Sequence, residues 1–134
     1  MAHGGDCVGT VGSPTLDAAF WILGVTVAVG LAIGCFYLQE RPIQGWARWI
    51  SAGHGLLGVM GSALFFVSMA AGASDRNGMG RVAMSLLVGT LMGAAVVAYA
   101  QIRRRRPSGL AVALHATLGV AGYVIFAAYA STPH

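Results

Sequence analysis

Charged residues divide the chain into four long uncharged stretches. These stretches cover residues 18–39, 49–74, 82–102 and 107–134. Each is long enough to provide the ~20 mostly apolar residues that cross the hydrocarbon core of a membrane as a helix. The pattern therefore predicts an all-α protein, a membrane four-helix bundle that forms a single integral membrane domain over residues 1–134.

The composition agrees with this prediction and excludes several functions. Hydrophobic residues make up 57% of the chain and charged residues 9%, whereas a soluble domain carries roughly 25% charged residues. The sequence has no lysine, which excludes imine chemistry on a lysine side chain. Its acids are Asp6, Asp17, Glu40 and Asp75, none of them inside a predicted helix. This excludes paired-carboxylate catalysis within the membrane.

Arginine placement predicts the orientation. Arg41 and Arg48 lie between the first and second stretches, and residues 103–106 are four consecutive arginines between the third and fourth. The remaining connection holds only Arg76 and Arg81. The positive-inside rule then places both termini outside the cytoplasm. We interpret the arginine run as topogenic and lipid-binding, with no nucleic-acid partner.

The second and fourth stretches share a motif. Residues His54 to Phe65 and His115 to Phe126 both read H-x-x-L-G-V-x-G-x-x-x-F, 61 residues apart. A weaker match, 62 residues apart, pairs Tyr37-x-Gln39 with Tyr99-x-Gln101. We therefore expect two copies of a helical hairpin, over about 18–74 and 80–132.

The shared positions fall mainly on one face of each helix. Five of the six identities lie within an arc of about 100° at helical periodicity. The glycines remove side chains beneath each imidazole, which leaves a trough for a flat group or allows a close helix crossing. Histidine within a membrane helix is rare and usually functional. The candidate cofactor-binding residues of this face are His54, Gly58, Gly61, Phe65, His115, Gly119, Gly122 and Phe126.

The two histidines have the chemistry of axial haem ligands. If the hairpins insert in the same direction, both imidazoles lie about 9–14 Å from the flanking arginines and can face each other across the bundle. One iron with two axial imidazoles is a bis-histidine haem b, one per chain or per dimer. Because both axial positions are then filled, the predicted role is electron transfer, not stand-alone enzymatic catalysis.

Other polar residues are assigned around this haem. Arg48, or an arginine of the run 103–106, is a candidate partner of the haem propionates. The second nitrogen of each imidazole should donate to a carbonyl or hydroxyl group, with Ser51, Ser85, Thr90 and Thr117 as candidates. His3 and Cys7 in the N-terminal tail offer only two ligands and are weak evidence for a metal site.

His54 and His115, within their repeated segments, resemble the ligands of small four-helix b-type cytochromes of bacterial membranes. That group includes haem-carrying membrane anchors and quinone-reactive dihaem cytochromes b. The resemblance covers about half of the chain. It implies a bacterial cytoplasmic (inner) membrane protein and electron passage between a quinone and a partner subunit. Dihaem members carry four histidine ligands, whereas this chain offers two.

Two other functions remain open. The chain is a cofactor-free structural or assembly subunit of a larger membrane complex if the histidines only form hydrogen bonds between helices. It is a pigment-binding subunit if each histidine ligates a chlorophyll magnesium. In every case the lipid membrane is a partner, and the chain is expected to act as an oligomer or as a subunit of a complex.

Overall fold

The computed structural model describes residues 14–38, 45–71, 78–103 and 105–132. They form four helices: α1 (Pro14–Leu38), α2 (Gly45–Ala70), α3 (Met79–Ile102) and α4 (Gly109–Ala130). All four are long and apolar enough to cross a membrane, and the described residues contain no strand. The prediction of an all-α four-helix bundle is confirmed.

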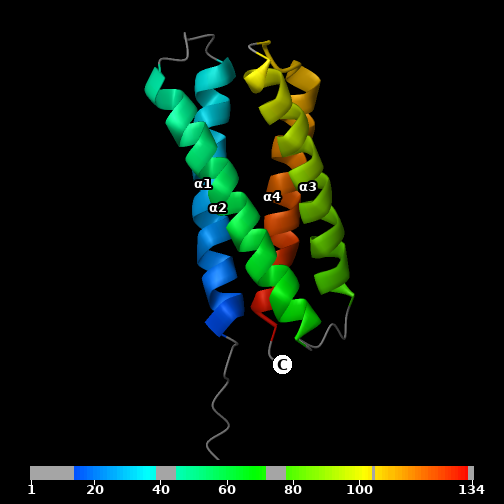
Figure 1. The fold of residues 1–134 in the computed structure, drawn as a ribbon. Coiled ribbons are helices and arrows are strands. Elements are labelled where there is room, and N and C mark those ends of the chain that lie inside the picture. The colour runs from blue at the N-terminus through cyan, green and yellow to red at the C-terminus, as the bar shows by residue number, and fades with distance from the viewer. Residues whose placement is uncertain (1–13, 39–44, 72–77, 104, 133–134) are drawn as a thin grey trace, which may run out of the picture.

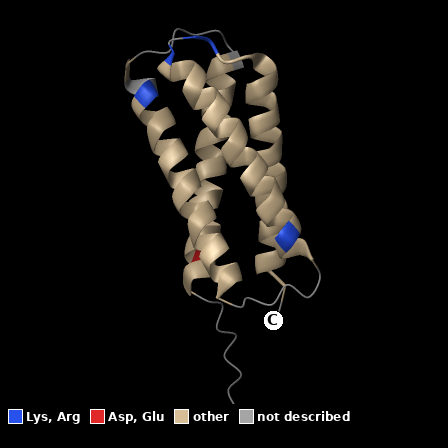
Figure 2. Cartoon of the chain, turned by 45° about the vertical axis from the view of Figure 1, so that its right-hand side comes forward, with Lys and Arg blue, Asp and Glu red and all other residues tan. Residues whose placement is uncertain are grey.

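The helices alternate in direction and are arranged as two hairpins (Figure 1). Helices α1 and α2 form one hairpin, α3 and α4 the other, and the hairpins meet chiefly through α1 and α4. The end of α1 and the start of α2 lie at the same end of the bundle as the end of α3 and the start of α4. We name this the arginine-rich end, because Arg48, Arg103, Arg105 and Arg106 are exposed there. Described charged residues lie only near the two ends (Figure 2).

Helices α1, α2 and α3 begin before the corresponding uncharged stretches, whereas α4 lies within its stretch. Arg48 and Arg81 were expected in connections, but they lie inside α2 and α3. Asp17 lies in the first turn of α1, at the start of the helix as expected. Local features mark the starts of α3 and α4. Gly78 before α3 has a φ of 71°, a left-handed conformation that glycine adopts without strain. Before α4, the Ser108 side chain accepts a hydrogen bond from the Ala111 amide.

The core lies in the half of the bundle away from the arginine-rich end. Phe65 of α2 and Phe126 of α4 are fully buried, and their ring centroids are 4.6 Å apart. This pair joins the two hairpins, with Phe20 and Tyr129 close by. From Thr26, Gly61, Leu87 and Gly122 towards the arginine-rich end, no further described residue is buried.

Polar contacts tie the ends together. At the end with the core, the Ser68 hydroxyl donates to Thr15 Oγ1 at 2.9 Å and so links α1 to α2. At the arginine-rich end, the Tyr37 hydroxyl donates to the Pro107 carbonyl at 2.7 Å, which joins the first hairpin to the second. Tyr99 is instead exposed and accepts a hydrogen bond from Arg103 Nε at 3.2 Å. The two tyrosines that match in sequence therefore make different contacts.

We predict that Phe126→Ala lowers the free energy of unfolding by about 2 kcal/mol. This is less than the ~3–5 kcal/mol typical of soluble cores, because lipid also solvates an apolar side chain and only the packing contribution is lost. Unfolding in mixed micelles measures the change. Val124→Ala on the same helix is the control, since Val124 is 58% exposed and should change the free energy little. Equal effects of both substitutions would contradict the assigned core.

Candidate functional site

The structure brings His54 of α2 and His115 of α4 together from different hairpins. Their ring centroids are 6.1 Å apart, and the ring planes are nearly perpendicular, at 89°. Both histidines are partly buried. The site thus lies between the hairpins, on the arginine-rich side of the phenylalanine pair.

Each imidazole is held by a backbone carbonyl of its own hairpin. His54 Nδ1 lies 3.0 Å from the Thr26 carbonyl oxygen on α1, and His115 Nδ1 lies 3.0 Å from the Thr90 carbonyl oxygen on α3. A carbonyl oxygen only accepts hydrogen bonds, so each Nδ1 carries the proton. In a neutral ring, Nε2 then has a free lone pair, which is the form that ligates a metal.

The groups that accept the imidazole N–H protons differ partly from the partners predicted from the sequence. Thr90 is a partner of His115, but through its carbonyl, while the Ser85 hydroxyl donates to the Arg81 carbonyl. Thr26 was not anticipated. The Thr26 and Thr90 hydroxyls both donate four residues back along their helices, to the carbonyls of Ile22 and Leu86.

A sequence signal for the threonines does exist. Ala19, Leu23 and Thr26 on α1 match Ala83, Leu87 and Thr90 on α3, as A-x-x-x-L-x-x-T, 64 residues apart. These two alanines, these two leucines and Thr26 are buried. The pairing of Tyr37 with Tyr99, 62 residues apart, misses this alignment by two positions.

The four motif glycines lie against the other helix of their own hairpin. A methyl group on Gly58 would lie 3.5 Å from Thr26 Cγ2, and one on Gly119 would lie 3.3 Å from Thr90 Cγ2. A methyl on Gly61 would lie 2.8 Å from the Leu23 side chain. Gly122 likewise faces Leu86 and Leu87, at 3.3 and 3.4 Å. These contacts are those of a close helix crossing.

The other candidate residues lie further from the imidazoles. Phe65 and Phe126 belong to the core, eleven residues or about 16 Å along the helix from each histidine. Arg48 is exposed on α2, about 9 Å along the axis from His54. His3 and Cys7 lie outside the described residues.

Two glycines that the sequence interpretation did not single out face the histidines. A methyl group on Gly30 of α1 would lie 2.7 Å from His54 Cε1. A methyl on Gly93 of α3 would lie 3.2 Å from His115 Cβ. Both α1 and α3 therefore approach a histidine through a residue without a side chain.

Among the described residues, no group of three or more His, Cys, Asp or Glu side chains could hold a metal ion. A bare structural metal such as zinc needs about four ligands. The histidine pair could therefore hold a metal only if other ligands come with it.

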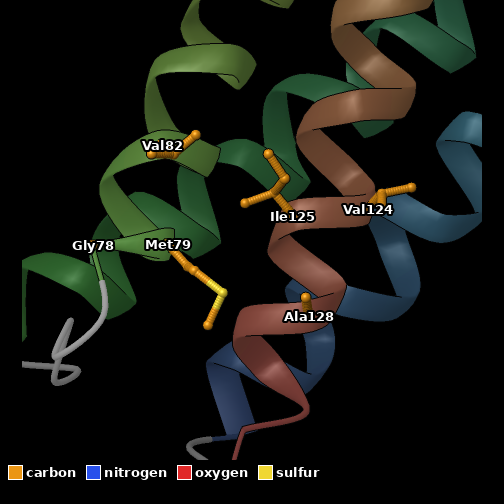
Figure 3. A pocket seen from close by; sticks show the side chains of 6 residues that line it. All are labelled: Gly78, Met79, Val82, Val124, Ile125 and Ala128. Atoms are coloured by element: carbon orange, nitrogen blue, oxygen red, sulfur yellow. The ribbon is translucent and has the colours of Figure 1, made fainter.

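A separate hollow of about 340 Å³ lies between the start of α3 and the end of α4 (Figure 3). It is open and lies away from the histidines, at the opposite end of the bundle. Its lining offers no side chain with acid–base or ligating chemistry apart from a methionine thioether: it consists of Gly78, Met79, Val82, Val124, Ile125 and Ala128.

The chain matches no protein-family model, no curated protein and no solved structure.

The glycine contacts yield a stability prediction. Gly61→Ala should lower the stability by about 1 kcal/mol, because the added methyl overlaps the Leu23 side chain. Gly53→Ala on the same helix is the matched control, since a methyl there meets nothing within 4 Å and alanine favours the helix. Unfolding in mixed micelles compares the two variants. A Gly61→Ala protein as stable as the Gly53→Ala protein would rule out the close crossing at Gly61.

Proposed function

We propose that this chain is a membrane b-type cytochrome, with His54 and His115 as the axial ligands of one haem b between α2 and α4. It transfers electrons as a subunit or anchor of a respiratory or quinone-linked complex. One observation carries the proposal. Two imidazoles from different hairpins stand 6.1 Å apart, and each has its Nδ1 bound to a backbone carbonyl.

The spacing of the rings suits a single metal ion between them. With a metal–nitrogen bond of about 2 Å and roughly 1 Å from the nitrogen to the ring centre, the two ring centres would be about 6 Å apart. The observed separation is 6.1 Å. The distance between the ring centres is thus compatible with both imidazoles ligating one ion.

The second nitrogens support the same role. A ligating histidine almost always donates its other N–H to a carbonyl or carboxylate, which orients the ring and makes it a better ligand. The Thr26 and Thr90 carbonyls are in place to do this for His54 and His115. Each of these two hydrogen bonds joins helices of the same hairpin, so each histidine is oriented by its own hairpin.

The ligand count favours a macrocycle over a bare ion. The histidine pair lacks a third ligating side chain among the described residues, whereas a porphyrin provides four nitrogens of its own. When bound, haem b supplies reversible one-electron chemistry at its iron. Both axial positions would be occupied by imidazole, which leaves no position for dioxygen.

The charges suggest how the protein sits in the membrane. We place the arginine-rich end in the cytoplasm by the positive-inside rule, which leaves both chain termini extracytoplasmic. Arg48 and Arg103 are exposed at this end and are candidates to neutralise haem propionates. The electron partner would be a quinone or another subunit.

A cofactor-free structural or assembly subunit is the second candidate. It is favoured by the contacts of Gly58, Gly61, Gly119 and Gly122, which face the neighbouring helix of the same hairpin. In that case the histidines serve only to bond the helices of each hairpin.

Absorption spectra of the purified chain in mild detergent test the proposal. We expect a six-coordinate, low-spin spectrum with a sharpened α band on reduction, and a pyridine haemochrome of protohaem. His54→Ala and His115→Ala should each abolish this spectrum, because both axial positions are needed. His3→Ala is the control and should keep full haem content.

Two results would reject the proposal. One is a colourless protein from a host with ample haem, which would favour the structural subunit. The other is full six-coordinate haem in either the His54→Ala or the His115→Ala variant. A magnesium pigment in place of protohaem would favour the pigment-binding alternative.

A further inference from the structure

We propose that Gly30 is a positioning residue for His54. Because glycine has no side chain, the His54 imidazole can reach the Thr26 carbonyl with its Nδ1 while its Nε2 stays free. As an account of ligand positioning, this inference rests on the proposed function. The contact between Gly30 and His54 can be tested without a cofactor.

The geometry around Gly30 is specific to the imidazole. A methyl group at this position would lie 2.7 Å from His54 Cε1 and 3.4 Å from both Nδ1 and Nε2. Real Cβ atoms essentially never approach another heavy atom as closely as the first of these distances. The methyl would therefore press on the ring edge that carries both nitrogens.

The neighbouring backbone explains why a shift of the ring would cost it its hydrogen bond. His54 Nδ1 bonds to the carbonyl of Thr26, four residues before Gly30 on α1. In a helix, that carbonyl also accepts the amide of residue 30, so Gly30 lies next to the acceptor that His54 uses. A side chain at position 30 would push the ring away from this carbonyl, and the hydrogen bond would be weakened or lost.

The second hairpin does not repeat this arrangement. A methyl on Gly93 would meet His115 Cβ at 3.2 Å and Cα at 3.4 Å, with Nδ1 further away at 3.6 Å. Gly93 therefore controls how closely the α3 backbone approaches α4. Gly30 instead contacts the tip of the imidazole, so its substitution should affect one histidine only.

The matched pair of variants is Gly30→Ala and Gly34→Ala. The two glycines are one turn apart on α1, and a methyl on Gly34 meets nothing within 4 Å. Both substitutions make the same change in helix propensity. A difference between them therefore reports the contact with His54.

The first measurement is ¹⁵N NMR of the full chain labelled at histidine, in detergent micelles, assigned with His54→Ala and His115→Ala. The wild type should show slowly exchanging Nδ1–H protons on His54 and His115. In Gly30→Ala, the His54 Nδ1–H should be lost or should exchange at least about fivefold faster, the factor expected for one hydrogen bond. His115 should be unchanged, and Gly34→Ala should match the wild type. Unchanged His54 exchange in Gly30→Ala would overturn the proposal.

A double-mutant cycle covers the case in which Gly30→Ala folds poorly. If the methyl acts only through the imidazole, Gly30→Ala should be harmless in a His54→Ala background. Equal thermal stability of His54→Ala and the double variant would therefore support the proposal. A loss of stability as large as in the wild-type background would assign Gly30 to helix packing and overturn it.

The haem spectrum separates this inference from the proposed function. If the wild type binds haem, Gly30→Ala should shift the midpoint potential or the low-spin g values, while Gly34→Ala leaves both unchanged. A wild type without haem rejects the proposed function but leaves the NMR and stability tests of Gly30 valid. A haem-binding wild type with an unaltered Gly30→Ala spectrum rejects the positioning role alone.

Discussion

In each hairpin, an imidazole N–H donates to the backbone carbonyl of a threonine on the neighbouring helix. An unpaired N–H within the hydrocarbon region is costly, and a helical carbonyl has a second lone pair that can accept this bond without breaking the helix. The bond requires the two helices to lie close together. Gly58 and Gly119 permit this approach, because each faces the methyl group of the same threonine. Histidine, threonine and glycine therefore form one unit in each hairpin.

This local bonding explains why the two halves of the bundle differ. Phe65 and Phe126 join the hairpins in one half. In the half that holds the histidines, no described residue beyond the level of Thr26 is buried. The imidazoles are positioned by their own hairpins and do not depend on dense packing between the hairpins. Such preorganisation lowers the cost of ordering ligands when a group binds between them.

The sequence predicted the number and type of helices, because the bilayer thickness dictates the length of an apolar span. It also singled out His54 and His115, because ionisable residues are rare in such spans. The A-x-x-x-L-x-x-T match marks the position of Thr26, but the sequence could not identify its carbonyl as an acceptor, since any residue supplies a backbone carbonyl. It also could not distinguish Gly30, which faces an imidazole, from Gly34, which faces nothing within 4 Å. That difference depends on how α1 rotates against α2.

The glycine contacts constrain where a haem could lie. Side chains of α1 and α3 already occupy the space in front of Gly58, Gly61, Gly119 and Gly122, so a macrocycle could not also rest there without separating the helices of each hairpin. A haem held by both imidazoles would instead lie between the hairpins, where the ring centroids are 6.1 Å apart. Helix packing by the motif glycines and metal ligation by the motif histidines are then both possible, because the glycines contact the other helix of their own hairpin while the two imidazoles also approach each other between the hairpins.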